Sequence, residues 1–478
     1  MTGSAGVRQI SGGAPRDCGT DKEKADRLLA ERLSGFTHKI VVLDDDPTGV
    51  QTVHDVSVYT DWETESIRSG FAEENPMFFI LTNSRSFSAE ETARVHRLIA
   101  QRVAQAAKES GKEFILISRG DSTLRGHYPL ETGTLCETLE AETNRAVDGE
   151  IICPFFPEGG RFTMGNVHYV KEKSVFIPAG MTEFAKDKSF GYQSSDLTEY
   201  VEEKTGGAYK KEDCICITLD ELHNHDVASV KEKLMAAEHF AKIIVNAMTY
   251  EDLKVFCAAF LDAVKEGKQF LARTAAAFPK VLGGVTDRPL LGRKELIAES
   301  GSGGIVLVGS HVKKTTMQLE CLMQSEAALS YIEFDVNTCF VPGGLAAETA
   351  RVTAEAEAAI QNKKTAVVYT SRKLLVPDTA DRDEILKVSV EISDAVTAVI
   401  GNLSVKPAFI LAKGGITSSD VGTKALRVKK ATVMGQVLKG IPVWMTGEES
   451  KFPGMPYIIF PGNVGDETAL RQIVEELV

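Results

Sequence analysis

The feature of this sequence that most constrains its fold is a junction at which an apolar strand runs into glycine just before a helix begins. It occurs three times in the C-terminal part, as Ile305–Val308 into Gly309-Ser310, Phe409–Ala412 into Gly414-Gly415, and Tyr457–Phe460 into Gly462-Asn463. The first turn of a helix offers unpaired N–H groups and a positive dipole end, and glycine lets an anion approach them closely. One such junction is ordinary in an α/β protein. Three in one domain predict a phosphate-rich ligand, for which a nucleotide is the natural candidate.

Length and composition are typical of a globular protein with two domains. The 478 residues exceed the usual limit of one hydrophobic core, and the 43% hydrophobic and 25% charged content is ordinary. A net charge of −13 argues against nucleic-acid or anionic-membrane partners. No apolar run approaches the ~20 residues that span a bilayer, and the Gly/Ser-rich start lacks the apolar region of a secretory signal. We therefore expect a cytoplasmic protein, with residues 1–37 as flexible tail and lead-in.

The N-terminal half alternates short apolar runs with amphipathic stretches. The predicted strands are Lys39–Leu43, Met77–Leu81, Phe114–Ser118, Glu150–Cys153, Ile215–Leu219 and Lys242–Asn246. Ser88–Ser110 is predicted as a helix, because Ser88 suits an N-cap before two glutamates and Gly111 suits the C-terminal end. Strands that alternate with helices predict a mostly parallel sheet.

The C-terminal half repeats this alternation after a Gly- and Pro-containing segment. The predicted strands there are 305–308, 331–334, 365–370, 408–412 and 457–460, and the predicted helices start at about 311 and cover 346–361, 383–401, 417–438 and 466–477. The fold class is therefore α/β, with two domains that each hold a mostly parallel sheet flanked by helices. We place the domains at 38–269 and 305–478, with 270–304 as a crossing or hinge, and expect the active site in the cleft between them.

Three loops of the N-terminal domain follow predicted strands, where parallel α/β sheets bind their ligands. The loops are Asp44-Asp45-Asp46-Pro47-Thr48-Gly49, Thr82-Asn83-Ser84-Arg85-Ser86, and Ser118-Arg119-Gly120-Asp121-Ser122-Thr123-Leu124-Arg125-Gly126-His127. Arginine binds a carboxylate through two hydrogen bonds, while Asp, Ser and Thr hold hydroxyl groups. A carboxylate can also accept a hydroxyl proton during phosphoryl transfer. The three loops together predict a site for a small polyhydroxylated acid.

Each of these loops also has a purely structural interpretation. Asp45 and Thr48 suit a turn, Arg119 could pair with Asp121, and three adjacent acids could simply be solvated. For one loop we favour that interpretation, and for three successive strand ends we favour a site. Adjacent acids repel one another, so a magnesium ion or a substrate could compensate them. We favour substrate contact by Asp46.

The usual nucleotide-binding motifs are missing. The sequence contains no Walker A loop and no Rossmann G-x-G-x-x-G, so a nucleotide would need a non-standard cradle and a dehydrogenase is disfavoured. Two helix starts supply hydroxyl and amide groups for such a cradle. They are Gly309-Ser310-His311 with Thr315 and Gln318 on the following turns, and Gly414-Gly415-Ile416-Thr417.

These residues resemble the four-carbon acid sugar kinase family over nearly the whole chain after residue 38. The motifs that carry the resemblance are Asp45-Asp46-Pro47-Thr48-Gly49, Arg85 in Asn83-Ser84-Arg85-Ser86, Asp121-Ser122-Thr123, Gly309-Ser310, Gly414-Gly415-Ile416-Thr417 and Gly462-Asn463-Val464-Gly465. The sequence departs from the family pattern at Pro47, at 118–120 and at 154–161. The resemblance implies transfer of a phosphoryl group from ATP, with Mg²⁺ bridging its phosphates, to a terminal hydroxyl of an acid such as threonate, erythronate, 3-oxo-tetronate or a branched relative.

The loops, the helix starts and the resemblance together predict roles for residues. Substrate binding falls to Asp45, Asp46, Thr48, Arg85, Arg119, Gly120, Asp121, Ser122, Thr123 and Arg125. Nucleotide binding falls to Ser310, Thr315, Gln318, Gly414, Gly415, Ile416, Thr417, Gly462 and Asn463. We expect Arg85, or else Arg119 or Arg125, to bind the substrate carboxylate, and Asp46 or Asp121 to accept the proton. The alternative function is a catalytically idle sensor that binds the same ligands. The sequence leaves open whether the protein forms a homo-oligomer.

Overall fold

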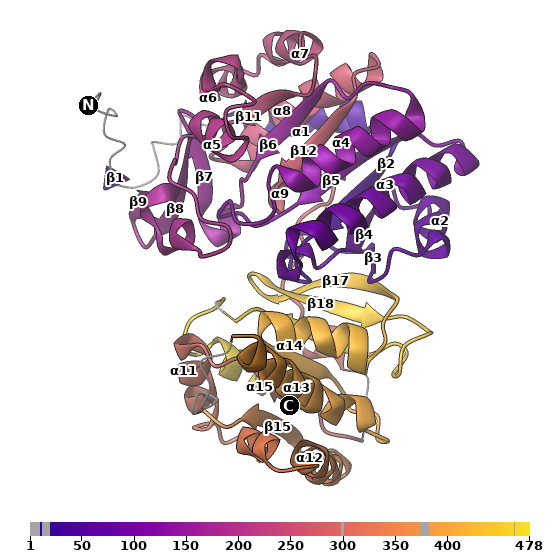
Figure 1. Ribbon diagram of the computed structural model, residues 1–478, viewed down its shortest axis with the longest axis vertical. Helices are drawn as coiled ribbons and strands as arrows, with labels where there is room; N and C mark the ends of the chain where they lie inside the picture. Colours follow the sequence, from indigo (N-terminus) through magenta and orange to yellow (C-terminus); the bar gives the residue numbers. More distant parts are fainter. Residues whose placement is uncertain (1–9, 12–19, 298–300, 373–381, 463) are drawn as a thin grey trace. The chain divides into compact units, whose positions relative to one another are not determined.

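The computed structural model describes residues 10–11, 20–297, 301–372, 382–462 and 464–478. The chain forms two compact units, shown in Figure 1. The first comprises Met1–Gly49 and Asp61–Thr286, and the second comprises Val50–Thr60 and Asp287–Val478. The two-domain α/β fold predicted from the sequence is confirmed.

The first unit is built on a sheet in which every neighbouring pair of strands is parallel. Its strand order is β10 (Ile215–Ile217), β11 (Ala241–Val245), β6 (Gly149–Cys153), β12 (Phe270–Thr274), β5 (Phe114–Arg119), β2 (Lys39–Asp44) and β4 (Met77–Leu81). All residues of the two neighbours β2 and β4 are buried, which explains their continuous apolar character in the sequence. The carboxyl ends of β4, β2, β5 and β12 therefore lie together at one edge.

Helices cover both faces of this sheet, as Figure 1 shows. On one face α3 (Ala89–Ser110) packs against α2 (Thr64–Ala72) and α4 (Leu130–Thr143), and on the other α1 (Lys22–Leu33) packs against α8 (Tyr250–Lys265). The shorter helices are α5 (Leu197–Lys204), α6 (Leu219–His223), α7 (Val227–Met235) and α9 (Ala277–Leu282). The predicted caps of α3 are present: Ser88 Oγ accepts from the Glu91 N–H at 3.2 Å, and Gly111 has φ +64°.

A small antiparallel sheet of the first unit was not predicted. It runs in the order β1 (Ile10–Ser11), β9 (Val175–Pro178), β8 (Val167–Glu172) and β7 (Arg161–Met164). These strands are short and carry charged residues, so the sequence has no long apolar run to indicate them. The sheet positions Arg161 at the start of β7.

The second unit has a mixed sheet. Its strand order is β3 (Val56–Tyr59), β17 (Lys430–Leu438), β18 (Ile441–Thr446), β19 (Pro456–Phe460), β16 (Ile410–Lys413), β13 (Ile305–Val308), β15 (Thr365–Thr370) and β14 (Leu329–Phe334). Pairs from β3 to β19 are antiparallel, and pairs from β19 to β14 are parallel. The helices are α10 (Arg293–Leu296), α11 (Lys313–Leu322), α12 (Gly344–Gln361), α13 (Arg382–Asn402), α14 (Gly415–Asp420) and α15 (Ala469–Leu477).

The predicted helix 417–438 is wrong. Helix α14 ends at Asp420, a π-helical turn covers Val421–Ala425, and Lys430–Leu438 forms β17. Along β17 the more buried residues alternate with the more exposed ones, as expected for a strand that pairs on both sides but has one buried face. The predicted helix therefore merged a short helix, a π-helical turn and a strand into one element.

The unit boundaries also differ from the predicted ones. Residues 50–60 belong to the second unit, because β3 pairs with β17 from Lys430↔Tyr59 to Val433↔Val56. The predicted crossing 270–304 begins with β12, which lies between β5 and β6 in the sheet of the first unit. Both differences come from pairings between segments distant in sequence. Within the described residues, no helix combines the length and apolar character needed to cross a membrane.

Candidate functional site

The three predicted loops of the first unit meet at one edge of its parallel sheet. Asp44 lies opposite Leu81 of β4 and Arg119 of β5, and Arg119 lies opposite Thr274 of β12. The Thr82 N–H and hydroxyl both donate to the Asp44 carbonyl, at 2.8 and 3.0 Å. The sheet register thus brings the carboxylates and guanidiniums of the loops together, as expected from the strand-end rule.

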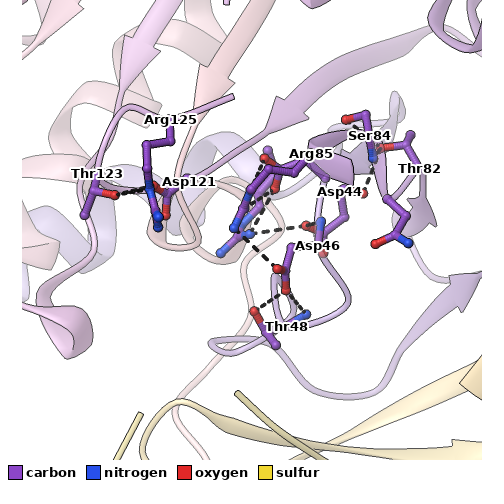
Figure 2. Close-up of polar contacts among 12 residues, drawn as sticks. Asp44, Asp46, Thr48, Thr82, Ser84, Arg85, Asp121, Thr123 and Arg125 are labelled. Carbon is purple, nitrogen blue, oxygen red and sulfur yellow. Dashed lines mark hydrogen bonds and ion pairs between the residues drawn. The ribbon is translucent and has the colours of Figure 1, made fainter. Parts of the chain in front are cut away.

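Arg85 forms the densest set of ion pairs in this cluster. Its Nε and Nη2 contact the two Asp45 carboxylate oxygens at 3.1 and 2.6 Å, and its Nη1 contacts Asp46 Oδ2 at 3.3 Å. Figure 2 shows Arg85 directed at Asp46, which is linked in turn to Thr48. The Thr48 N–H and hydroxyl donate to Asp46 Oδ1 at 2.8 and 2.5 Å. Both oxygens of Asp46 are therefore engaged within the protein.

Asp44 is the most buried member of the acidic triplet. Its Oδ1 lies 3.3 Å from Arg119 Nη1, and its side chain is 2% exposed. Burial raises the pKa of Asp44 to about 7, and the charges of Asp45 and Asp46 add to the rise while Arg119 opposes it. For Asp46, burial alone would raise the pKa, but Arg85 and the Thr48 hydrogen bonds outweigh burial and hold it below its usual value. A Cβ on Gly49 would lie 2.0 Å from Asp44 Oδ1, so glycine is required there.

A second group forms around Asp121, seen beside the first in Figure 2. Arg125 Nε lies 2.8 Å from Asp121 Oδ2, and the Thr123 hydroxyl donates to the same oxygen. Burial opposes ionisation of Asp121, but the Arg85 and Arg125 charges and these hydrogen bonds hold its pKa far below its usual range. Its other oxygen, Oδ1, makes no hydrogen bond within the described chain. The Asp121 side chain is 13% exposed, so this oxygen is open to a ligand.

Two buried charged residues of the first unit were missed by sequence reasoning. Arg273 of β12 pairs through Nη1 with Glu131 Oε2 at 2.8 Å and with Ser118 Oγ at 3.2 Å. Glu131 Oε1 also accepts from the Ser84 hydroxyl at 2.9 Å. A Cβ on Gly120 would lie 2.2 Å from Arg273 Cζ, so Gly120 makes room for this guanidinium. The strand-end rule, applied to 270–274, could have indicated Arg273.

The remaining predicted residues of this loop are anchored by their backbone. The Ser122 carbonyl lies 2.8 Å from His168 Nε2, and the Thr123 carbonyl accepts from the Tyr192 hydroxyl at 2.8 Å. Burial lowers the pKa of His168 to about 4, so this imidazole is neutral near pH 7. These contacts fix the loop that carries Asp121.

In the second unit, the three glycine junctions also meet at one sheet edge. Val308, Lys413 and Phe460 end neighbouring strands in register. A Cβ on Gly309 would lie 2.4 Å from Thr417 Oγ1, and one on Gly462 would lie 3.6 Å from Ser310 Oγ. Gly414 has φ +130°, which favours glycine. The predicted Ser310, Gly414, Gly415, Ile416, Thr417 and Gly462 are thus brought together, and Ile416 is 71% exposed.

Thr315 and Gln318 have a supporting position in this unit. Both side chains are fully buried. Thr315 Oγ1 donates to the Gly462 carbonyl at 3.3 Å, and Gln318 Nε2 donates to the Val464 and Asp466 carbonyls at 3.1 and 2.7 Å. They tie the last glycine loop to α11. The predicted Asn463 lies outside the described residues.

Two cations near these loops were missed. Arg372 follows β15 and donates through Nη2 to the Ser310 carbonyl and Thr316 Oγ1 at 2.7 and 2.8 Å, while its buried Nε and Nη1 have no hydrogen-bond partner among the described residues. Lys413 ends β16 and donates to the Pro461 carbonyl at 2.6 Å. Burial, with the Lys314 charge, lowers the pKa of Lys413 to about 7. Both cations sit at strand ends, so the rule that indicated Arg85 could have indicated them.

Comparison with known protein families also assigns different ligands to the two parts of the chain. Residues 40–282 match a family model described as a sugar-binding N-terminal domain. Residues 305–470 match a model described as a nucleotide-binding C-terminal domain. The chain belongs to this sugar-binding and nucleotide-binding family. The expected pairing of a sugar-binding domain with a nucleotide-binding domain is therefore confirmed.

Two solved structures share the fold of this family member. A Haemophilus influenzae protein, HI1011, described by the family model DUF1537, superposes with a TM-score of 0.62 at 17% identity, covering 92% of this chain and 100% of its own. A Salmonella typhimurium LT2 protein described as a candidate tRNA synthase has a TM-score of 0.63 at 17% identity, covering 90% of this chain and 98% of its own. No curated protein matches the sequence.

The sugar-binding domain does not fit a protein-built magnesium site. Within the described ranges, no three or more His, Cys, Asp or Glu side chains are arranged to hold a metal ion. The acidic triplet Asp44–Asp46 is compensated by Arg85 and Arg119, which supply the positive charge that a cation would otherwise bring. Arginine is thus a third source of compensation, besides the magnesium ion and the substrate considered from the sequence.

Proposed function

We propose that this protein is an ATP-dependent kinase that phosphorylates a terminal hydroxyl of a small sugar acid. The observation that carries the proposal is Asp121, an ionised carboxylate at a strand end of the sugar-binding domain with one oxygen free to accept a hydrogen bond. The nucleotide-binding domain supplies three glycine loops and the unpaired N–H groups of Arg372 for phosphates. The specific resemblance to four-carbon acid sugar kinases supports the acceptor class.

Asp121 is the better candidate for the proton acceptor. Asp46 uses both oxygens within the protein, whereas Asp121 presents Oδ1. In the proposed reaction, the substrate hydroxyl donates to Asp121 Oδ1, its oxygen attacks the γ-phosphorus, the bond to the β-γ bridging oxygen breaks, and the proton passes to Asp121. Phosphoryl transfer depends mainly on alignment and charge stabilisation, so a weakly basic carboxylate suffices.

The nucleotide phosphates are assigned to the glycine loops. At Gly309 and Gly462 the missing side chain lets an anion approach the backbone closely, whereas the Gly414 N–H already donates to the Phe460 carbonyl at 2.9 Å. Arg372 Nε and Nη1 offer two further donors, and Lys413 adds a cation at the same edge. Mg²⁺ enters this proposal only with ATP, since it binds phosphates while keeping several waters. The expected cleft between the two domains stays a prediction.

The test is an ADP-release assay with Mg-ATP and a panel of four-carbon aldonic and oxo-acids, branched ones included. Turnover of one acid, abolished by removal of ATP, supports the kinase. ATP binding measured by calorimetry without turnover of any acid contradicts it and supports the sensor. A matched panel of neutral polyols checks that the carboxylate matters.

A further inference from the structure

The guanidinium expected to bind the substrate carboxylate is already neutralised. Arg85 makes two contacts with Asp45 and one with Asp46, and Arg119 lies 3.3 and 3.6 Å from Asp44 and Asp45. Three carboxylates therefore face two guanidiniums. An additional carboxylate placed here would meet a group that carries no surplus positive charge, so this part of the site attracts it weakly.

A surplus of positive charge lies on the other side of Asp121. Arg125 contacts Asp121 Oδ2 at 2.8 Å and reaches Asp187 only at 3.9 Å. Arg161, at the start of β7, has no carboxylate within 4.0 Å in the described part of the chain, and its one protein acceptor is the Gly159 carbonyl. Its Nε is buried and has no hydrogen-bond partner in the ranges that the structure describes. A buried N–H of a guanidinium without an acceptor is costly unless a ligand supplies one.

Phe184 holds the two cations close to one another. Its ring centroid lies 5.1 Å from Arg125 Cζ and 5.5 Å from Arg161 Cζ. Burial lowers the pKa of Arg161, Arg125 adds to the decrease, and Asp121 and Glu172 oppose it from beyond ion-pair distance. The neighbouring His168 is neutral near pH 7, so it does not change the net charge around the two arginines. The guanidiniums of Arg125 and Arg161 together have one close carboxylate contact, that of Arg125 with Asp121. The pair therefore has positive charge left to bind a second anion.

We propose that Arg161, assisted by Arg125, binds the carboxylate of the substrate and makes the site selective for sugar acids over neutral polyols. This inference rests on the proposed function and replaces Arg85 as the carboxylate ligand. Arg85 then acts as a positioning residue that orders the Asp45 and Asp46 loop. The small sheet β1–β9–β8–β7 gains a role, because it carries the residue that determines specificity.

The test compares threonate with threitol, which replaces the carboxylate by a hydroxymethyl group. Kd is measured by calorimetry without nucleotide, and kcat/KM by ADP release, for the wild type and for Arg161→Gln, Arg161→Lys and Arg85→Gln. Arg68→Gln is the matched control, since Arg68 pairs with Glu109 on the exposed surface of the same unit. We expect Arg161→Gln to weaken threonate on the order of 100-fold and to leave threitol unchanged. Arg161→Lys should restore part of this loss, because it keeps the charge.

Other outcomes overturn the inference. Equal losses for threonate and threitol in Arg161→Gln would mean that Arg161 only supports the fold. Loss of acid preference in Arg85→Gln but not in Arg161→Gln would return the carboxylate to Arg85. If the wild type binds threonate no better than threitol, the anion site is absent. Failure of the kinase proposal looks different: threonate then binds through Arg161 in calorimetry, but no acid yields ADP.

Discussion

The sugar-binding and nucleotide-binding units build anion sites at strand ends by different means. In the first, charged side chains such as Arg85 and Asp45 compensate one another. Of the site arginines (Arg85, Arg119, Arg125, Arg161 and Arg273), Arg161 is the one without an ion pair in the described part of the chain. In the second, glycine loops present backbone N–H groups, and Lys413 and Arg372 have no carboxylate partner within the ranges that the structure describes. The comparison teaches that a sugar hydroxyl needs a precisely oriented hydrogen-bond acceptor. Phosphates instead need many hydrogen-bond donors and cations that are not neutralised by carboxylates.

The sharpest way to break the comparison is to remove the free acceptor of the sugar-binding unit. Asp121→Asn keeps the shape of the side chain but cannot take the proton, so we expect kcat to fall about 1000-fold with a change in KM below about threefold. Steady-state ADP release measures both constants. Asp46→Asn should reduce kcat less, because both Asp46 oxygens serve the protein. Near-native kcat in both variants would dismiss the assigned base.

Removing the unpaired cation of the nucleotide-binding unit should produce the next largest effect. Arg372→Met deletes the two N–H groups for which the described chain offers no acceptor, and we expect kcat/KM for ATP to fall by about 10- to 100-fold. The Kd for the sugar acid should stay unchanged. Arg351→Met is the control, since Arg351 pairs with Glu348 and Glu355 on α12. Equal effects of the two substitutions would show that Arg372 does not act on phosphates.

Crowding a glycine loop sharpens the contrast between backbone and side-chain recognition. In Gly309→Ala the new Cβ would lie 2.4 Å from Thr417 Oγ1, so the two loops must separate. We expect ATP binding, measured by calorimetry, to weaken about tenfold, and Gly309→Ala with Thr417→Ala to recover part of the loss. Gly301→Ala meets nothing within 4 Å and should bind ATP normally. Unchanged binding in Gly309→Ala would remove this loop from the phosphate site.

The smallest expected effect concerns pH and the buried Asp44. Its pKa is raised to about 7 in the folded protein, against 3.8 for an unperturbed aspartic acid side chain. The folded state therefore binds more protons between these values, and this group makes stability fall as pH rises from about 4 to 7. Thermal unfolding of Asp44→Asn should show a shallower decline, with Tm differences of a few degrees across that range. Parallel Tm curves for the two proteins would contradict the assignment.

Local patterns made much of the fold predictable. Strands such as Met77–Leu81 and Ile305–Val308 are continuous apolar runs because they are buried on both faces, and their bounds were predicted correctly. The caps of α3 were also predictable, since capping depends on a few neighbouring residues. By contrast, Lys430–Leu438 was assigned to a helix, because its status as a strand depends on pairing with β3 and β18.

The candidate site divides in the same way. Asp46, Arg85 and Asp121 could be found because each follows a recognisable strand within a motif. Arg161 could not, because a single arginine in an irregular stretch has no local signature. Arg273 was missed because 270–304 was predicted as a crossing, so the strand-end rule was not applied to β12. Thr315 and Gln318 looked like ligands, yet they are buried supports of a loop.

The sequence by itself determined the α/β class, the strand-end loops and the types of group that those loops carry. These properties depend on hydrophobic periodicity and on motifs of a few residues. Only the tertiary structure decided which charges neutralise one another: Arg85 is compensated by Asp45 and Asp46, and Arg161 is left for an anion. The physical reason is that an ion pair depends on distance in space, and the sheet order that sets those distances joins segments far apart in the chain.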